Sequence, residues 1–189
     1  IAKNAPGRLE FSPDGKMTPF SPGFRSHNCL GVDLQDRLFV SDYQGYWLGT
    51  SKLFHVQQGR FYGHPASLTW SGDWKKGRNP LKVAAGEFDA KRTRAAVLFP
   101  QGFMANSPTQ PLPDSTKGRF GPFAGQLLVG EMNRSRIARV MLDEVAGELQ
   151  GACVPFYDDA GLTRGSHRFV FGSDGSLWVG QTHLSWVGG

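Results

Sequence analysis

Side chains that can bind a small charged ligand gather on either side of three short apolar segments, residues 38–40, 127–129 and 177–179. An arginine binds anions through its forked donors, an aspartate with nearby carbonyls binds a cation, and a loop histidine can relay a proton. The candidates by position are Arg25, Ser26, His27 and Asn28 before the first segment, Asp42, Gln44 and Gly45 after it, Asn133 and Arg134 after the second, and Gln181, Thr182, His183 and Trp186 after the third. If the three segments are neighbouring strands of one fold, these groups form a shared rim.

Several of these side chains also have a purely structural explanation. Arg25 can hold a neighbouring backbone carbonyl, and Asp42 can form an Asx-turn after a strand. A loop histidine such as His27, His64 or His183 can pack a turn without taking part in chemistry. Rings that can stack on a sugar or a flat cofactor, or else pack between strands, are those of Tyr46, Trp47 and Trp186.

Motifs of several other functional classes are missing. The sequence has no GxGxxG after a strand-like run, no Walker loop, no HExxH and no GxSxG. The net charge of +5 is too small to indicate a nucleic-acid partner, and no apolar run approaches the roughly 20 residues that cross a bilayer. Cys29 and Cys153 lie in apolar runs, which favours buried free thiols over a disulfide.

The elements that hold these residues are expected to be short strands. Glycine (25) and proline (12) are spread along the 189 residues and disfavour long helices, while a 39% hydrophobic content with 14 Phe and 5 Trp can bury a core. The Asp-Gly pairs at residues 14–15 and 174–175 predict tight hairpins, because both central residues of such a turn take a positive φ. A polar turn at residues 146–147 separates two more predicted strands, residues 136–142 and 149–155.

The spacing of the apolar segments predicts a repeating fold. Their starts at residues 38, 127 and 177 fit one period of roughly 40–50 residues, which is typical of the four-stranded blades of a β-propeller. We therefore expect an all-β fold, a partial β-propeller of about four blades of four-stranded antiparallel sheets, with the apolar segments in the inner strands. Residues 1–189 are expected to form one incomplete propeller domain, an internal piece of a longer protein.

An elaborated insertion or long loop is expected at about residues 65–121, where prolines and polar residues dilute the strand pattern. Within it, Asp89 is expected to cap one helical turn that runs through Ala95. Residues 96–99 are expected to form a buried strand, and residues 106–117 a long loop.

Residues 23–42 resemble a blade of the soluble quinoprotein glucose and sorbosone dehydrogenases. They are more similar still to propeller modules of large secreted proteins from planctomycete-type bacteria, which are often joined to a cytochrome c domain. Residues 53–65, 120–127 and 150–156 extend the resemblance over most of the chain.

The resemblance implies a six-bladed propeller with pyrroloquinoline quinone (PQQ) over the channel mouth and Ca²⁺ between the cofactor and backbone carbonyls. Arg25 matches the arginine that contacts the quinone, and Gln44 and Gly45 fall near the calcium-binding carbonyls, with Asp42 as the neighbouring carboxylate. The further residues expected at the cofactor are Ser26, Asn28, Asn133, Arg134 and His183. The family sequence Arg-Asn-Pro-Gln-Gly reads Arg-Ser-His-Asn-Cys at residues 25–29, and the general base would come from an earlier blade outside this chain.

Two functions follow from this resemblance. The first is a PQQ-dependent oxidoreductase that oxidises a CH–OH group of a sugar or alcohol, with Arg25 stabilising charge on the quinone oxygens. The second is a non-catalytic propeller that serves as a carbohydrate- or protein-binding module of a secreted protein. The family implies a periplasmic or extracellular location, a small-molecule substrate, and a possible cytochrome c domain in the parent chain.

Overall fold

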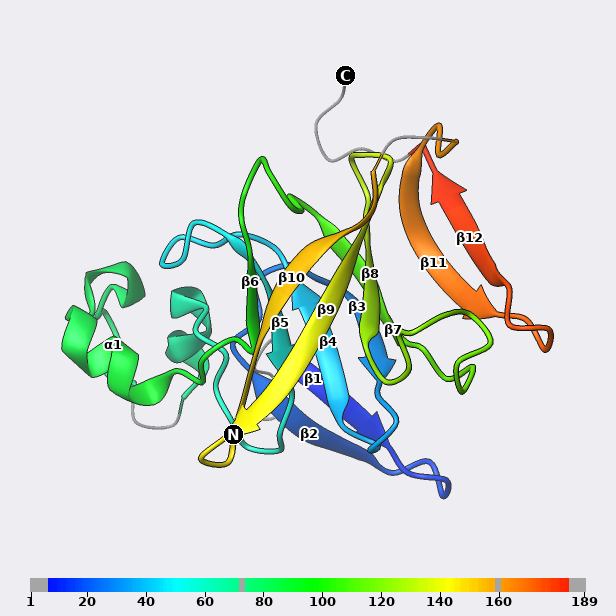
Figure 1. The fold of residues 1–189 in the computed structure, drawn as a ribbon. Coiled ribbons are helices and arrows are strands. Elements are labelled where there is room, and N and C mark those ends of the chain that lie inside the picture. The colour runs from blue at the N-terminus through cyan, green and yellow to red at the C-terminus, as the bar shows by residue number, and fades with distance from the viewer. Residues whose placement is uncertain (1–6, 72–73, 159–160, 184–189) are drawn as a thin grey trace.

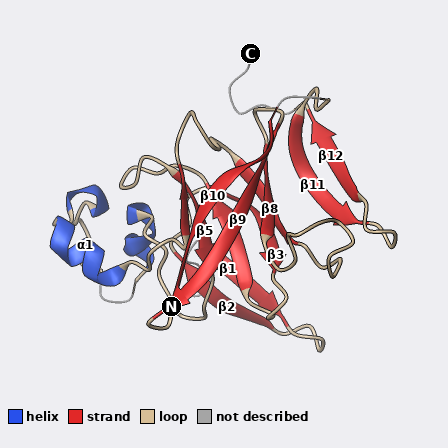
Figure 2. Cartoon of the chain, viewed as in Figure 1, coloured by secondary structure: helices blue, strands red, loops and turns tan. Residues whose placement is uncertain are grey.

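The computed structural model describes residues 7–71, 74–158 and 161–183. The regular structure of these residues is mostly β-strand, with a few short helices (Figures 1 and 2). The strands are β1 (Gly7–Phe11), β2 (Met17–Pro22), β3 (His27–Val32), β4 (Leu38–Asp42), β5 (Ser51–His55), β6 (Val97–Phe99), β7 (Pro108–Pro113), β8 (Leu127–Glu131), β9 (Arg136–Val145), β10 (Glu148–Asp158), β11 (Gly165–Phe171) and β12 (Leu177–Thr182).

The strands assemble into antiparallel sheets in chain order. Strands β3–β6 form one four-stranded sheet, here the first blade, and β7–β10 form another, the second blade. The hairpins β1–β2 and β11–β12 form two further sheets of two strands each. Successive four-stranded antiparallel sheets of this kind are the blades of a β-propeller. The prediction of an all-β, partial propeller is therefore confirmed.

Glycine-containing turns set the hairpins where the sequence predicted them. Gly15 between β1 and β2 has φ +80°, and Gly175 between β11 and β12 has φ +91°. The turn between β9 and β10 places both Ala146 (φ +53°) and Gly147 (φ +80°) in the left-handed region. These three connections follow from local chemistry alone, because few residues other than glycine adopt such angles.

The first strands of the two blades and of the last hairpin face a common centre. Strands β3 and β7 lie so close that a Cβ built on Gly31 would be 1.9 Å from the carbonyl oxygen of Pro111. The hydroxyl of Thr109 in β7 donates to the carbonyl of Ser166 in β11 at 2.8 Å. A guanidinium nitrogen of Arg168 in β11 donates to Sγ of Cys29 in β3 at 2.7 Å. Strands β3, β7 and β11 thus converge on a hub.

The apolar segments found in the sequence lie one strand further out than expected. They occupy β4, β8 and β12, the second strands of these three sheets, so their expected place in the innermost strands is wrong. The reason is packing: β4 and β8 are covered on both sides, and Val40 and Val129 are fully buried. A second strand buried in this way carries the most continuous apolar run.

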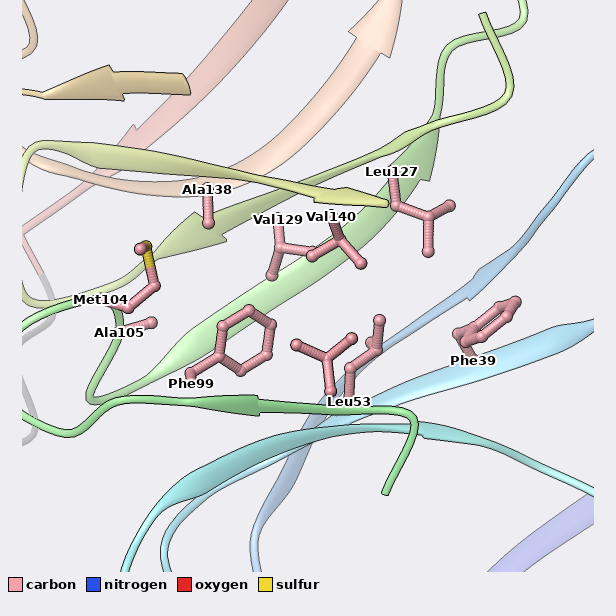
Figure 3. Packing of buried hydrophobic residues seen from close by; sticks show 10 residues of the cluster. Phe39, Leu53, Phe99, Met104, Ala105, Leu127, Val129, Ala138 and Val140 are labelled. Carbon is pink, nitrogen blue, oxygen red and sulfur yellow. The ribbon is translucent and has the colours of Figure 1, made fainter. Parts of the chain in front are cut away.

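The main core lies between the two complete blades, where apolar side chains of both sheets interlock (Figure 3). Its buried members are Phe39, Leu53, Val97, Phe99, Met104, Ala105, Leu127, Val129, Ala138 and Val140. Burial of these side chains removes apolar surface from water and holds the blades face to face. The position of one blade relative to the other is thereby fixed.

Residues 56–96 connect β5 to β6 and carry the helices (blue in Figure 2): η1 (Pro65–Trp70), η2 (Pro80–Lys82) and α1 (Ala85–Lys91). The helix α1 begins after Ala84, and no side chain caps it. The prediction of a cap at Asp89 is wrong, because Asp89 lies inside α1 and pairs with Arg92 at 2.5 Å. This segment is called the insertion below.

Two other sequence predictions had opposite outcomes here. The strand expected at residues 96–99 is confirmed as β6. The long loop expected at residues 106–117 is wrong, because it contains β7 with three prolines. Strand β7 is an edge strand of its sheet, and proline is tolerated there because its missing N–H leaves no ladder bond broken.

Neither Cys29 nor Cys153 forms a disulfide, as the sequence favoured. Cys29 is buried and Cys153 is half-buried. Within the described part of the chain, none of the helices has the length and apolar character needed to cross a membrane.

Candidate ligand site at one end of the blades

The candidate residues around the apolar segments share one end of the blades. Strands β3, β7 and β11 begin where β4, β8 and β12 finish, since His27 pairs with Asp42, Pro108 with Glu131 and Gly165 with Thr182. The connections that follow β4, β6 and β8 therefore lie at the same edge, the upper edge in Figure 1. We call this edge the mouth end.

Asp42 holds the segment that enters the first blade. Its Oδ1 accepts a hydrogen bond from the backbone N–H of Ser26 at 2.8 Å, and its Oδ2 accepts one from the backbone N–H of Arg25 at 3.2 Å. The residue is only 1% exposed. Asp42 therefore joins the end of β4 to the two residues before β3, across 16 and 17 positions of sequence, and does not form a local Asx-turn.

The same arrangement recurs in the next two sheets. Glu131, at the end of β8, accepts bonds from the two backbone N–H groups of residues 106–107 before β7 at 3.3 and 3.1 Å. Gln181, near the end of β12, accepts bonds from residues 163–164 before β11, both at 3.0 Å. We call this contact the clasp: a side chain at or near the end of the second strand accepts hydrogen bonds from two backbone N–H groups before the first strand. The hydrogen bonding of Asp42 therefore has a structural purpose.

Lys52 distinguishes the clasp of the first blade from the others. Its Nζ lies 3.6 Å from Oδ2 of Asp42 and donates to the backbone carbonyl of Tyr43 at 2.5 Å. Lys52 is 5% exposed, and this burial lowers its pKa while the Asp42 carboxylate opposes the shift. A buried ammonium thus sits between a carboxylate and a carbonyl at the mouth end.

These contacts do not fit Ca²⁺ at Asp42. Both carboxylate oxygens already accept backbone N–H groups, and the Lys52 ammonium would repel a second cation at this distance. Residues 43–50 contain no other carboxylate. Gln44 and Gly45 lie in this loop, and the N–H of Gly45 is bonded to the carbonyl of Leu48 at 2.9 Å. Among the described residues, no group of three His, Cys, Asp or Glu side chains could hold a metal ion.

A pocket opens beside Lys52, between the loop after β4 and the insertion. Arg25 lines it together with Tyr46 from the loop and His64 and Arg92 from the insertion. The guanidinium carbon of Arg25 lies 5.8 Å from the centre of the Tyr46 ring, in a cation–π contact. The pocket, here the mouth pocket, encloses about 20 Å³, which is space for roughly one water molecule or one small polar group.

His64 provides an acceptor or donor at the wall of this pocket. Its ring stacks on Tyr46 with 6.2 Å between centroids, and its Nδ1 is buried with no hydrogen-bond partner in the described structure. Burial lowers the pKa of His64, the Asp42 carboxylate opposes this shift, and Arg25 and Lys52 add to it. The imidazole is therefore neutral at pH 7 and can bind a polar group of a ligand.

A second group of candidates lines a different pocket of about 210 Å³. It lies between the loop after β8 and the start of β11, and its lining includes Asn133, Arg134 and His183. The amide nitrogen Nδ2 of Asn133 donates to the hydroxyl of Ser107 at 2.9 Å, and Arg134 donates to the carbonyl of Gly102 at 2.8 Å. These candidates share the mouth end with Arg25 but not its pocket.

Gly45 also lines the mouth pocket and Thr182 the second one, whereas Ser26, Asn28 and Gln44 line neither. Ser26 contributes its backbone N–H to the clasp, and Gln44 lies in the loop after β4. Asn28 points across the hub, where its Nδ2 is 3.5 Å from Nε2 of His167 in β11. Trp186 falls outside the described residues.

Sequence reasoning did not single out Lys52. A lysine one position before the apolar pair Leu53 and Phe54 looks like an exposed residue of an alternating strand. Four of the five residues of β5 are in fact buried, because the strand lies between its two neighbours and under the insertion. The only signal was a charged residue inside a short strand-like run.

Comparison with known proteins agrees with this geometry at the level of the fold. No family model matches the sequence, and no curated protein matches it. A solved structure from Thermus thermophilus, provisionally assigned as an oxidoreductase (glucose dehydrogenase), superposes with a TM-score of 0.55 at 19% identity over 85% of this chain. The chain spans 40% of that protein. The PQQ-bound aldose sugar dehydrogenase of Streptomyces coelicolor gives a TM-score of 0.46 at 19% identity, over 76% of this chain and 37% of that one.

The fold thus defines the class of protein. It is a β-propeller in which two complete blades and two hairpins are described, and its architecture is similar to that of the Thermus thermophilus protein. What the site binds has to be argued from its own residues.

Proposed function

We propose that this chain is part of a quinoprotein-type oxidoreductase that acts on CH–OH groups of a sugar or alcohol, with PQQ as its cofactor. The observation that carries the proposal is the charge of the mouth pocket. Arg25, Lys52 and Arg92 line it, while its one carboxylate, Asp42, is already engaged by the clasp. PQQ carries carboxylates and quinone oxygens, which are the acceptors that such donors suit.

The enclosed volume limits how such a cofactor sits. About 20 Å³ accommodates a single carboxylate or carbonyl group but not a tricyclic ring system. The ring would therefore lie over the pocket and insert one polar group. When bound, PQQ supplies the acceptor for a hydride from the CH–OH carbon.

The residues of the chain then have distinct roles. Arg25 binds the inserted anionic group, because its backbone is held by Asp42 and its guanidinium rests against Tyr46. His64 offers Nδ1 for a hydrogen bond to the same group. The insertion walls off the pocket from one side through Arg92 and residues 62–64. Binding and orientation of the anion are thus assigned to this chain, and the general base to a part of the protein outside it.

The proposal has finer parts that rest on sequence similarity alone. Asn133, Arg134 and His183 would contact the cofactor or substrate from the second pocket, and Ser26 and Asn28 would contact it from the segment that enters β3. The planctomycete-type modules suggest a secreted parent protein, periplasmic or extracellular, with a possible cytochrome c domain as electron acceptor.

The test of this proposal is PQQ binding by the chain, measured by the quenching of its tryptophan fluorescence. Arg25→Ala should weaken binding about 10- to 100-fold, the loss expected for one charge-assisted hydrogen-bond pair. Arg37→Ala is the matched control, because Arg37 binds Asp33 in the turn at the opposite end of the blade. Dye reduction by aldoses in the parent protein then tests catalysis. Absence of PQQ binding by the unaltered chain would refute the proposal.

A non-catalytic binding module is the second candidate. It is favoured by Tyr46, which is 73% exposed at the mouth end and can stack on a sugar ring. In that case sugars should bind without PQQ, and Tyr46→Ala should abolish their binding. A chain that binds PQQ and loses this binding with Arg25→Ala excludes the module as the sole function.

A further inference from the structure

The ammonium group of Lys52 occupies an uncommon position for a charged group. It projects from the middle of the first blade and is almost completely buried, with 6% of the side chain exposed. Buried ammonium groups are costly unless they are paired and hydrogen-bonded. The contacts of Nζ show how this one is paired.

Lys52 lies where oxygen atoms of two kinds converge. Oδ2 of Asp42 and the carbonyl oxygen of Tyr43 both face Nζ, at 3.6 and 2.5 Å. A carboxylate and a backbone carbonyl that point at one place are the ligands a hard cation such as Ca²⁺ takes. In this chain an ammonium group fills that place.

The clasp itself does not require a cation. Glu131 makes the corresponding clasp in the second blade, and its Oε1 accepts a third N–H, from Asn133 at 3.0 Å. Arg136, at the start of the neighbouring strand β9, turns away and pairs with Asp158 at 2.6 Å. A clasp carboxylate is thus stable without an ammonium partner, so the role of Lys52 is not to complete the clasp.

Lys52 belongs to the mouth pocket as well as to the clasp. Its side chain lines the pocket together with that of Arg25. Nζ of Lys52 lies 5.9 Å from the centre of the Phe54 ring, in a cation–π contact. In the second blade a tight turn joins β9 to β10 in place of the insertion, and no lysine pairs with Glu131 among the described residues. The buried ammonium group and the mouth pocket therefore both occur in the first blade, and the second blade has no counterpart of this ammonium among the described residues.

We infer that the Lys52 ammonium is the resident cation of the mouth pocket, in the place of a divalent metal, and that the pocket binds its anionic ligand without Ca²⁺. The inference rests on the proposed function only for the identity of that ligand. The exclusion of a divalent cation from the position between Asp42 and Tyr43 follows from the contacts of Lys52 alone.

The first experiment measures metal binding by the unaltered chain. Ca²⁺ and EDTA should each leave the melting temperature unchanged, and Tb³⁺ should give no emission sensitised by the nearby Tyr43 and Trp47. If the chain binds PQQ, its affinity should be the same in Ca²⁺ and in EDTA. A rise in melting temperature with Ca²⁺, or PQQ binding that EDTA abolishes, would overturn the inference. Failure to bind PQQ under either condition refutes the proposed function and leaves the metal result standing.

The second experiment removes the ammonium. Lys52→Ala should lower the melting temperature, and propylammonium or butylammonium ions should restore part of the loss by entering the vacated space. Lys52→Met fills that space with an apolar chain, so amines should not restore it. Equal responses of the two variants to amines would contradict a specific cation position. If Lys52→Ala does not fold, the metal titration of the unaltered chain decides by itself.

Discussion

The two complete blades share one plan but differ at one connection. Both have four antiparallel strands, and both fasten the entering segment with a clasp carboxylate, Asp42 in the first and Glu131 in the second. In the second blade the outer strands β9 and β10 are joined by the tight turn at residues 146–147. In the first blade, residues 56–96 stand between β5 and β6, and residues 62–64, 92, 93 and 95 of this insertion line the mouth pocket. The clasp thus belongs to the fold, whereas the mouth pocket belongs to the insertion.

The difference between the two clasps should be largest when their charge is removed. Asp42→Asn leaves the Lys52 ammonium buried without a carboxylate, which typically costs about 3–5 kcal/mol. Glu131→Gln leaves no unpaired cation and should cost about 1–3 kcal/mol, the loss of charged hydrogen bonds to backbone N–H groups. Urea unfolding of both variants measures these free energies. Equal losses of unfolding free energy in the two variants would mean that the Asp42 carboxylate does not stabilise the buried Lys52 ammonium.

Truncation of one side chain should destabilise the insertion without destabilising the blades. Phe88 of α1 is fully buried, and its ring centre lies 4.5 Å from that of Trp47 and 6.1 Å from that of Phe61. Phe88→Ala should cost about 3 kcal/mol and act mainly on the insertion, because this cluster is separate from the core between the blades. Hydrogen exchange should speed up in residues 56–96 while β8 and β9 keep their protection. Uniform loss of protection would contradict this separation.

A substitution at the hub, where β3 of the first blade meets β7 of the second, should cause a smaller loss of stability. Gly31→Ala would place a methyl group 1.9 Å from the carbonyl of Pro111, so β3 and β7 must move apart, at roughly 1–3 kcal/mol. Gly49→Ala, in the loop after β4, meets nothing within 4 Å and serves as the control. Thermal unfolding compares the two variants. A Gly31→Ala chain as stable as the control would show that the first strands are not tightly packed.

The sequence predicted those features that depend on neighbouring residues. The hairpins at residues 14–15, 146–147 and 174–175 follow from turn chemistry, and the strand repeat follows from the apolar segments. Strand β7 was missed because proline argues against a strand unless the strand is known to be an edge, and edges are set by tertiary structure. The helix α1 was misplaced because its start at Ala84 has no capping side chain to reveal it.

The candidate site shows the same limit. Arg25 and Asp42 were found from their position beside an apolar segment, and both do line one pocket. The bonds between Asp42 and the segment before β3 span 16 and 17 residues, and the Lys52 contact joins two strands. Sequence spacing does not encode which of two roles a carboxylate takes when its partners come from other strands. That choice is made by the assembled sheet.

The smallest expected effect is a pH dependence that lies mostly in the first blade. Burial lowers the pKa of His55 and of His64 there, and of His167 in β11. Below about pH 6.5 the unfolded chain takes up protons that these half-buried imidazoles resist, so stability present at about pH 7.5 is lost as the pH falls through the unfolded and then the folded pKa values. Urea unfolding at about pH 7.5 and about pH 5.5 measures this loss, and His64→Gln should reduce it. Because His64 also faces Arg25 and Lys52 across the mouth pocket, a His64→Gln chain with an unchanged pH dependence would show that the pocket does not resist its protonation.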